Sequence, residues 1–197
     1  MIDDMEEDNS KYKVEFLGEN HCKEYITYKV IILGMFNVGK TTIIGKLMKL
    51  PDQIYEPTLS LDIKNIQIKV NDKIIQIQFW DTCGNDEFAG STPNLFKNAS
   101  LAILVFAIND HKSFDNLRSW YNLVKEHSFD NTLFLIGNKN DLKKEREVTM
   151  EEVENFKKSY DNINSNKFIL FLKFFFEFNF IKKLKCFLKL QPKVVKI

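Results

Sequence analysis

Residues 34–41 read Gly-Met-Phe-Asn-Val-Gly-Lys-Thr, which places two glycines ahead of a lysine and a threonine in the spacing G-x-x-x-x-G-K-T. Glycines at this spacing allow successive backbone N–H groups to turn inward around an anion. Lys40 would add positive charge for the β- and γ-phosphates of a nucleotide, and the Thr41 hydroxyl could ligate Mg²⁺. The residues assigned to nucleotide binding in this loop are Gly34, Asn37, Val38, Gly39, Lys40, Thr41 and Thr42.

This motif, the P-loop, requires a strand before it and a helix after it. Residues 28–33 are apolar and rich in β-branched side chains, as a buried strand should be. Residues 42–48 follow a helical pattern, and Pro51 should end that helix because proline cannot continue it. The positive N-terminal end of the helix would face the phosphates. In this setting a chance match in a surface loop is the weaker interpretation.

Two alternating segments predict a β-hairpin downstream of the P-loop. Residues 62–70 and 74–80 each alternate apolar and polar side chains, with a turn at 71–72. The second strand leads into Asp81, and an aspartate at this place in P-loop hydrolases holds Mg²⁺ through water. Gly84 leaves room for its N–H to approach a γ-phosphate.

Residues 101–107 are continuously apolar, as a strand buried on both faces should be, and residues 132–137 predict another buried strand. Between them, Ser113 is placed as the N-cap of a helix. A capping-box pattern at 149–152 should start another helix that continues to about Tyr160. Strands that alternate with helices predict an α/β fold, a mostly parallel sheet with helices on both faces.

Four motifs in order resemble those of the Ras superfamily of small GTPases, and of its Rab branch in particular. Besides the P-loop, residues 80–88 (Trp-Asp-Thr-Cys-Gly-Asn-Asp-Glu-Phe) are similar to the second switch of Rab proteins. Residues 113–117 with Trp120 are similar to the Rab third helix, and residues 138–141 are the guanine-reading motif N-K-x-D. The resemblance covers roughly residues 28–160 and implies the P-loop GTPase fold.

The resemblance also implies GTP or GDP with Mg²⁺ as cofactors. Thr41 and Thr58 would ligate Mg²⁺, and Asp81 would hold one of its waters. A carboxylate at Asp141 suits guanine, because it can accept from the ring N–H and the exocyclic amine together. The residues implied for guanine are Asn138, Lys139 and Asp141, and those for catalysis are Lys40, Gly84 and Asn85.

Three positions near the γ-phosphate depart from the family pattern. Asn85 replaces a glutamine that orients the attacking water, and an error of about 1 Å there can cost about 10²-fold in rate. Phe36 occupies a position that is usually small, where its ring would crowd the water or an arginine finger. Asn37 is the milder change, because asparagine tolerates unusual backbone angles. The favoured function is a Rab-like switch with slow GTP hydrolysis; the alternatives are a hydrolysis-deficient interaction module and a truncated product.

The base pocket departs from the family as well. Residues 50–53 offer no clear equivalent of the aromatic that packs across guanine, although Tyr55 could serve the neighbouring position. Residues 175–177 resemble the end of the family's last strand, but no Ser-Ala-Lys loop and long helix follow. The last strand and helix of the fold are therefore expected to be altered or missing.

Residues 167–197 form a tail rich in Phe and Lys, with eight lysines and one glutamate. A membrane-spanning segment is disfavoured, since the apolar run is short and is broken by Lys173 and Glu177. A basic, aromatic helix on a membrane surface is the second interpretation, and it would give weak membrane contact. Non-native coding sequence is favoured by the narrow composition and the missing loop. Cys186 is not in a prenylation motif, so no lipid anchor is visible in this chain.

The simplest organisation of the 197 residues is one small-GTPase domain, 27–166, between an acidic N-terminal extension, 1–26, and the tail. A net charge of +1 gives no reason to expect nucleic-acid binding. Three scattered cysteines without a signal peptide indicate reduced thiols in the cytoplasm, and the resemblance adds peripheral association with endomembranes. The partners that the resemblance implies are exchange factors, GTPase-activating proteins and effectors of vesicle traffic. The three isolated histidines, His21, His111 and His127, are interpreted as surface or structural residues.

Overall fold

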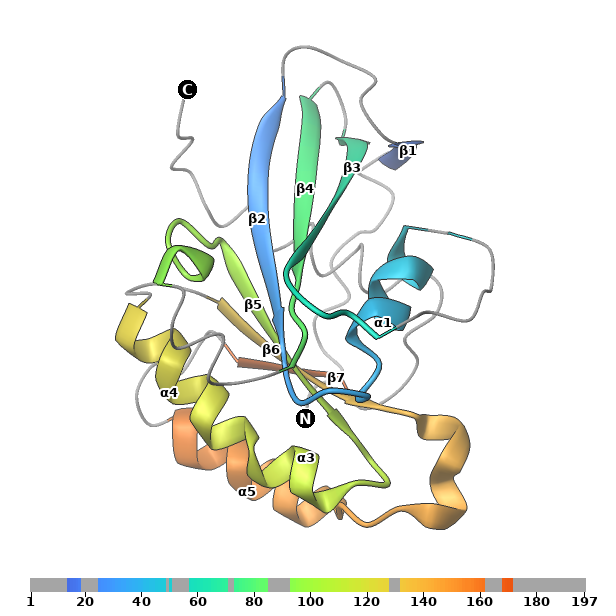
Figure 1. Cartoon of the computed structure of the whole chain (residues 1–197), viewed down its shortest axis with the longest axis vertical. Helices are drawn as coiled ribbons and strands as arrows, with labels where there is room; N and C mark the ends of the chain where they lie inside the picture. Colours follow the sequence, from blue (N-terminus) through green and yellow to red (C-terminus); the bar gives the residue numbers. More distant parts are fainter. Residues whose placement is uncertain are drawn as a thin grey trace, which may run out of the picture.

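Apolar, β-branched segments form the central sheet of the computed structural model, and helices cover it (Figure 1). The structure describes residues 14–18, 25–48, 50, 57–70, 73–84, 93–127, 132–161 and 168–171. Its strands are β1 (Val14–Gly18), β2 (Ile26–Leu33), β3 (Asp62–Val70), β4 (Lys73–Asp81), β5 (Leu101–Ala107), β6 (Thr132–Asn138) and β7 (Phe168–Phe171). Its helices are α1 (Lys40–Leu47), α3 (His111–Asp115), α4 (Leu117–His127) and α5 (Met150–Asp161), with 3-10 turns η2 (Pro93–Leu95) and η3 (Asn140–Glu145).

The order of these strands across the sheet is β1-β3-β4-β2-β5-β6-β7. β4, β2, β5, β6 and β7 are parallel neighbours, whereas β3 is antiparallel to both β4 and β1. In a parallel sheet the carboxyl ends of the strands lie at one edge, where ligands usually bind. That edge collects the P-loop after β2, Asp81 at the end of β4 and Asn138 at the end of β6.

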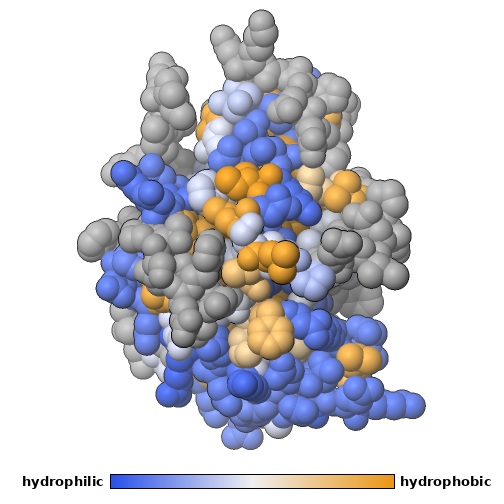
Figure 2. Space-filling model, viewed as in Figure 1, coloured by the Kyte–Doolittle hydropathy of each residue, from blue (hydrophilic) through white to orange (hydrophobic). Residues whose placement is uncertain are grey.

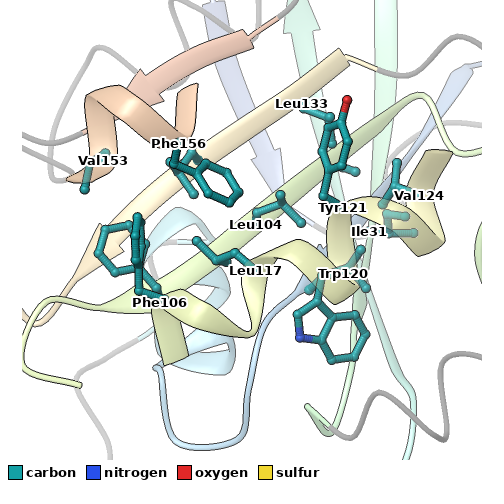
Figure 3. Close-up of a cluster of buried hydrophobic side chains, with 14 of the residues drawn as sticks. Ile31, Leu104, Phe106, Leu117, Trp120, Tyr121, Val124, Leu133, Val153 and Phe156 are labelled. Atoms are coloured by element: carbon teal, nitrogen blue, oxygen red, sulfur yellow. The ribbon is translucent and has the colours of Figure 1, made fainter. Parts of the chain in front are cut away.

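Consecutive residues of β2 face opposite sides of the sheet, and each side has its own hydrophobic core. Val30 and Ile32 pack in the core that includes α1, whereas Ile31 and Leu33 pack in the core that includes α3, α4 and α5. Figure 3 shows the second core, where side chains of α4 and α5 lie against β5 and β6. The predicted α/β fold with helices on both faces is confirmed. The buried residues of α4 have the three- and four-residue spacing of an amphipathic helix: Leu117, Trp120, Tyr121 and Val124.

The predicted hairpin is confirmed almost to the residue. β3 and β4 pair from Asp62 opposite Asp81 to Val70 opposite Lys73. This register leaves two residues for the turn at 71–72, which lies outside the described residues. The predicted strand before the P-loop is β2, and it begins at Ile26, two residues earlier than predicted.

The helix after the P-loop begins at Lys40, two residues earlier than predicted, and ends at Leu47. The N–H of Leu50 donates to the carbonyl of Gly45 at 2.9 Å, a bond that closes the last turn of a helix in a Schellman motif. Pro51, the predicted terminator, lies outside the part of the chain that the structure describes.

The predicted N-cap at Ser113 is wrong, because α3 begins two residues earlier and Asp110 is its N-cap. The carboxylate of Asp110 accepts from the N–H of Ser113 at 3.2 Å. Ser113 is buried, and its hydroxyl accepts from the N–H of Ala107 at 3.0 Å and donates to the Asp110 carbonyl at 2.7 Å. Both residue types suit an N-cap, and Ser113 instead ties the helix to the end of β5.

The capping box that the sequence predicts at the start of α5 is confirmed. The N–H of Thr149 donates to Glu152 Oε2 at 2.8 Å, and the N–H of Glu152 donates to Thr149 Oγ1 at 3.2 Å. The helix then continues to Asp161, one residue beyond the predicted end.

A short last strand, β7, pairs parallel to β6 at the edge of the sheet. It lies in the predicted tail, and β1 lies in the predicted N-terminal extension; both strands join the central sheet. The predicted strand end at 175–177 and the residues for a last helix are outside the described residues, as are 162–166 and Tyr55. Within the described residues, no helix is both long and apolar enough to cross a membrane.

Candidate functional site

Positive φ angles turn the P-loop back on itself after β2. Gly34 has a φ of 142°, Asn37 of 61° and Gly39 of 93°. A Cβ at Gly34 would lie 2.2 Å from the Val105 carbonyl oxygen, and one at Gly39 would lie 2.3 Å from Asn138 Nδ2. Only glycine fits both positions without displacing these neighbours. Asn37 adopts the left-handed conformation that asparagine tolerates better than most residues.

Lys40 places its ammonium inside this loop. Its side chain is buried, and Nζ donates to the carbonyl oxygens of Gly34 and Met35, each at 2.9 Å. Burial lowers the pKa of Lys40 to about 8, against the opposing influence of Asp81 and Cys83. The cation would therefore gain from the negative charge of a phosphate.

The three oxygen-bearing side chains that the sequence assigns to Mg²⁺ lie together beside the P-loop. Thr41 Oγ1 donates to Asp81 Oδ2 at 2.6 Å, and the hydroxyls of Thr41 and Thr58 are 2.9 Å apart. Thr58 Oγ1 is 3.4 Å from Asp81 Oδ2. These residues come from the start of α1, the segment before β3 and the end of β4. Their convergence is what a shared cation requires, and their role in metal binding stays a prediction.

The environment of Asp81 fits Mg²⁺. The side chain is fully buried, and its Oδ1 has no hydrogen-bond partner within the described structure. Burial raises the pKa of Asp81, although the hydrogen bond from Thr41 and the charge of Lys40 oppose this effect. A water bound to a divalent cation would supply the partner that Oδ1 lacks. One carboxylate and two hydroxyls form an oxygen donor set of the kind that Mg²⁺ prefers.

Gly84 lies close to the P-loop, and its contact with the γ-phosphate stays a prediction. Its φ is 85°, and a Cβ there would be 2.4 Å from the backbone nitrogen of Phe36 and 2.6 Å from Lys40 Nζ. The backbone of the second switch thus approaches the P-loop as closely as glycine permits. Asn85, the predicted catalytic neighbour, lies outside the described residues.

The guanine-reading motif follows β6 and is joined to the P-loop. Asn138 Nδ2 donates to the carbonyl of Val38 at 2.8 Å, so the first residue of the motif holds the phosphate loop. Lys139 has a φ of 60° and turns the chain into η3. Asp141 lies in the first turn of η3 and is exposed, and its role in reading the base stays a prediction. Of the remaining predicted loop residues, Thr42 is exposed.

The side chain of Phe36, a residue of the P-loop, is 68% exposed. Leu59, just after Thr58, is 92% exposed, and Ile63 at the start of β3 is 43% exposed. Figure 2 shows apolar surface gathered along the middle of this face, over the P-loop and the start of β3. The crowding of water by Phe36 therefore stays a prediction, and its ring is also available to a partner.

Lys29 is a half-buried residue of β2 whose contacts sequence reasoning did not identify. Its Nζ lies 3.5 Å from the centroid of the Trp80 ring and donates to the carbonyl oxygens of Asn94 and Lys97, at 2.9 and 3.0 Å. Burial lowers its pKa to about 8. Lys29 thus joins β2 to the segment after the second switch. A lone lysine in a strand gives no sequence signal for such a contact.

The fold and the site define a P-loop GTPase: a glycine loop at the edge of a mostly parallel sheet, a buried carboxylate with two hydroxyls, and N-K-x-D two strands away. The model of the Ras family matches residues 29–167. The chain therefore belongs to the Ras family. Members of this family are GTP-binding switches with GTPase activity, which generally bind guanine nucleotide with Mg²⁺ and act through regulators and effectors.

Proposed function

We propose that this chain is a Rab-like switch that binds GTP and GDP, hydrolyses GTP slowly and acts in vesicle traffic. The observation that carries the switch is the convergence of Thr41, Thr58 and Asp81 beside the P-loop. Thr58 belongs to the segment before β3. Because its hydroxyl would bind Mg²⁺, the position of that segment would depend on whether the site holds the metal and the nucleotide. The Rab assignment is supported by the second-switch and third-helix motifs in the sequence.

Mg²⁺, when bound, would neutralise charge on the β- and γ-phosphates. The hydroxyls of Thr41 and Thr58 would hold it directly, and Asp81 would hold one of its waters. Lys40 would bind the phosphates from inside the loop, and the N–H of Gly84 would contact the γ-phosphate. Loss of the γ-phosphate would release Thr58 and Gly84, the order-to-disorder change by which such switches work.

Slow hydrolysis follows from the side chains expected around the γ-phosphate. Asn85 is one methylene shorter than the water-orienting glutamine of the family, and Phe36 is large where the family is small. Because both would act on the same water, Phe36→Gly and Asn85→Gln together should increase the rate by more than the product of the single changes. Single-turnover phosphate release measured for all four combinations tests this. Fast release by the unaltered protein would contradict slow hydrolysis.

A second candidate function is a nucleotide-binding interaction module that does not cycle. The exposed ring of Phe36 favours this candidate, because an apolar P-loop residue is available to a partner, and Leu59 is exposed as well. Phosphate release with and without a Rab GTPase-activating protein separates the two functions. Stimulation by that protein supports a cycling switch, whereas bound GTP that persists in both reactions supports the module.

A further inference from the structure

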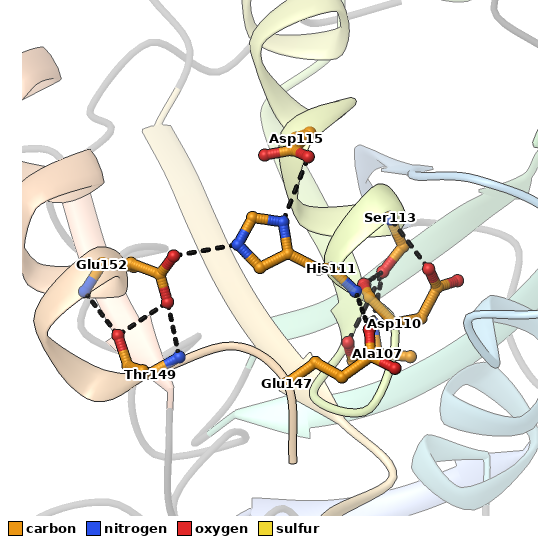
Figure 4. Close-up of polar contacts among 8 residues, drawn as sticks. All are labelled: Ala107, Asp110, His111, Ser113, Asp115, Glu147, Thr149 and Glu152. Atoms are coloured by element: carbon orange, nitrogen blue, oxygen red, sulfur yellow. Dashed lines mark hydrogen bonds and ion pairs between the residues drawn. The ribbon is translucent and has the colours of Figure 1, made fainter. Parts of the chain in front are cut away.

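His111 joins α3 to α5, because its two ring nitrogens face two carboxylates, Glu152 of α5 and Asp115 of its own helix (Figure 4). Its Nε2 lies 2.8 Å from Glu152 Oε1 in α5, and its Nδ1 lies 3.1 Å from Asp115 Oδ2 in α3. A neutral imidazole has one N–H, so it can donate to one of these carboxylates only. The imidazolium can donate to both, and this geometry therefore suits the charged ring.

The backbone of His111 belongs to the same connection. Its N–H donates to Glu147 Oε2 at 2.8 Å, and Glu147 lies in the segment between η3 and α5. We call the set His111, Glu147 and Glu152 the His111 clasp. It fastens the start of α3 both to the segment that leaves η3 and to the first turn of α5.

Ile108, three residues before His111, connects the His111 clasp to the guanine-reading motif. The N–H of Ile108 donates to the Asn138 carbonyl at 3.0 Å. The carbonyl of Ile108 accepts from the N–H groups of Glu147 and Val148, at 2.9 and 3.1 Å. One residue thus holds both ends of the segment that contains Lys139 and Asp141. Movement of α5 away from α3 would loosen both the His111 clasp and this segment.

We propose that His111 is a positioning residue whose charge state sets how firmly the guanine-reading segment is held, so that acid slows nucleotide release and alkali speeds it. This inference rests on the proposed binding of guanine nucleotides. It adds a regulation that acts through the hydrogen bonds of Ile108 at the two ends of the segment.

The charges around His111 agree with this direction. Hydrogen bonds to Glu152 and then Asp115 raise the pKa of His111 above its ordinary value of 6.5. Hydrogen bonds from Thr149 and His111 lower the pKa of Glu152 to about 2. The stabilisation by His111 is therefore fully present below about pH 6.5 and is lost as the pH rises through its higher folded-state pKa. The stabilisation by Glu152 is present above its ordinary pKa of 4.5 and is lost as the pH falls from there through about 2.

Arg118 of α4 lines the same groove as Asp115 and Glu152, together with Phe114, Asn155, Phe156 and Ser159. Its guanidinium provides a second cation in that groove, which limits how far the two carboxylates lose their pairing when His111 becomes neutral. The side chains of His111 and Glu152 are about 40% exposed, which keeps the effect moderate and sensitive to salt.

The experiment follows release of N-methylanthraniloyl-GDP from the full chain, in excess GDP with Mg²⁺, between about pH 5.5 and about pH 8.5. As the pH rises and His111 loses its proton, the release rate of the unaltered protein, divided by that of each variant at the same pH, should increase roughly two- to fivefold. His111→Gln should release quickly at every pH, and His111→Arg, permanently charged, should release slowly at every pH. The phosphates of the probe also titrate near pH 6, and they affect all the proteins alike. For this reason the rates are compared as ratios between proteins at the same pH.

Two further variants separate the His111 clasp from a general effect of substitution. Glu152→Gln keeps a residue that a capping box accepts but removes the charge, so it should behave like His111→Gln. His127→Gln removes the other described histidine, which stacks on Phe96 at the far end of α4, and should keep the pH profile of the unaltered protein. High salt should reduce the difference between the unaltered protein and His111→Gln.

The outcomes distinguish the two proposals. Tight probe binding with identical pH profiles for the unaltered protein and His111→Gln overturns the His111 clasp and leaves the switch intact. Failure of the unaltered protein to bind the probe at any pH overturns guanine-nucleotide binding, and with it the regulation inferred here. A rate ratio that changes with pH, and is removed by both His111→Gln and Glu152→Gln, supports the His111 clasp.

Discussion

The hydroxyl of Thr41 donates to Asp81 Oδ2 at 2.6 Å, although the two residues are 40 positions apart in the chain. This bond joins the first turn of α1 to the last residue of β4. It satisfies one oxygen of a fully buried carboxylate and leaves Oδ1 without a partner in the described structure. A buried acceptor without a partner costs free energy, so the protein is less stable without a cation than with one.

Asp81→Asn should separate stability from metal binding. The change removes a buried charge, so the free energy of unfolding of the nucleotide-free protein should rise by about 1 kcal/mol. Burial raises the folded-state pKa of Asp81 above 3.8, so the unaltered protein loses stability as the pH rises from about 3.8 through that folded-state value. The variant should lack this loss. Urea denaturation at several pH values measures both effects.

The same variant tests the metal site. Mg²⁺ should slow GDP release from the unaltered protein and should have little effect on release from Asp81→Asn. Asp62→Asn is a matched control, because Asp62 lies opposite Asp81 in the β3–β4 ladder but is exposed and paired with Lys64. An equal response to Mg²⁺ in Asp81→Asn and the unaltered protein would exclude Asp81 from the site.

Nucleotide binding should take up protons near pH 8. Burial lowers the pKa of Lys40 to about 8, so this side chain is about half protonated there in the free protein. A bound phosphate would stabilise the ammonium and raise its pKa, so roughly half a proton should enter with the nucleotide at pH 8, and fewer at pH 7. Titration calorimetry of GDP in buffers with different ionisation enthalpies measures this uptake.

Lys29 provides the control for the calorimetry, because burial lowers its pKa to about 8 as well. Lys29→Arg keeps a cation beside Trp80 that does not titrate, and it should leave the proton uptake unchanged. If Lys29→Arg abolished the uptake, the protons would not enter at Lys40.

Asp141→Asn should shift the preference of the protein from guanine toward xanthine nucleotides, because an amide presents a different donor and acceptor pattern from a carboxylate. The preference for GDP over XDP should fall by roughly 10²–10⁴-fold, as expected when a hydrogen-bonded recognition pair is exchanged. Competition against N-methylanthraniloyl-GDP measures it. Glu145→Gln changes an exposed carboxylate in the same turn, η3, and should keep the guanine preference. ATP that competes as well as GTP with the unaltered protein would refute the assignment.

Local pattern was enough to predict most of the sheet and the residues around the phosphates. Asp81 was placed by its position at the end of an alternating strand, and the hairpin bounds followed from the alternation in 62–70. Capping chemistry was predicted correctly at Thr149, where the box is contained in four consecutive residues. It was wrong at Ser113, because a serine and an aspartate three residues apart both suit the cap and only packing against β5 decides between them.

The contacts that sequence reasoning missed join residues from separate elements. His111 and Glu152 are 41 positions apart, and no sequence motif indicates that they pair. The carbonyls that Lys29 binds lie 65 and 68 positions further along the chain. Such pairs depend on how α5 and η2 dock on the sheet, which periodicity does not give. Asn85 and residues 172–197, for which the sequence made specific predictions, are outside the described residues.

The close approach of Gly39 and Asn138 allows a test of whether the phosphate site and the base site depend on each other. A Cβ at Gly39 would lie 2.3 Å from Asn138 Nδ2, the atom that donates to the Val38 carbonyl. Gly39→Ala should therefore break that bond and also strain a residue whose φ is 93°. We expect GDP affinity to fall at least about tenfold, since a lost hydrogen bond and backbone strain each cost about 1 kcal/mol or more.

Asn138→Ala removes the atom with which the new methyl group would collide. In that background Gly39→Ala should lower GDP affinity by less than it does in the unaltered protein, because only the backbone strain remains. Fluorescence titration of all four proteins with N-methylanthraniloyl-GDP gives the coupling. Thermal unfolding without nucleotide identifies any variant that loses affinity because it fails to fold. Strictly additive losses in folded variants would mean that Asn138 does not hold the P-loop through Val38, and that the two halves of the site bind nucleotide independently.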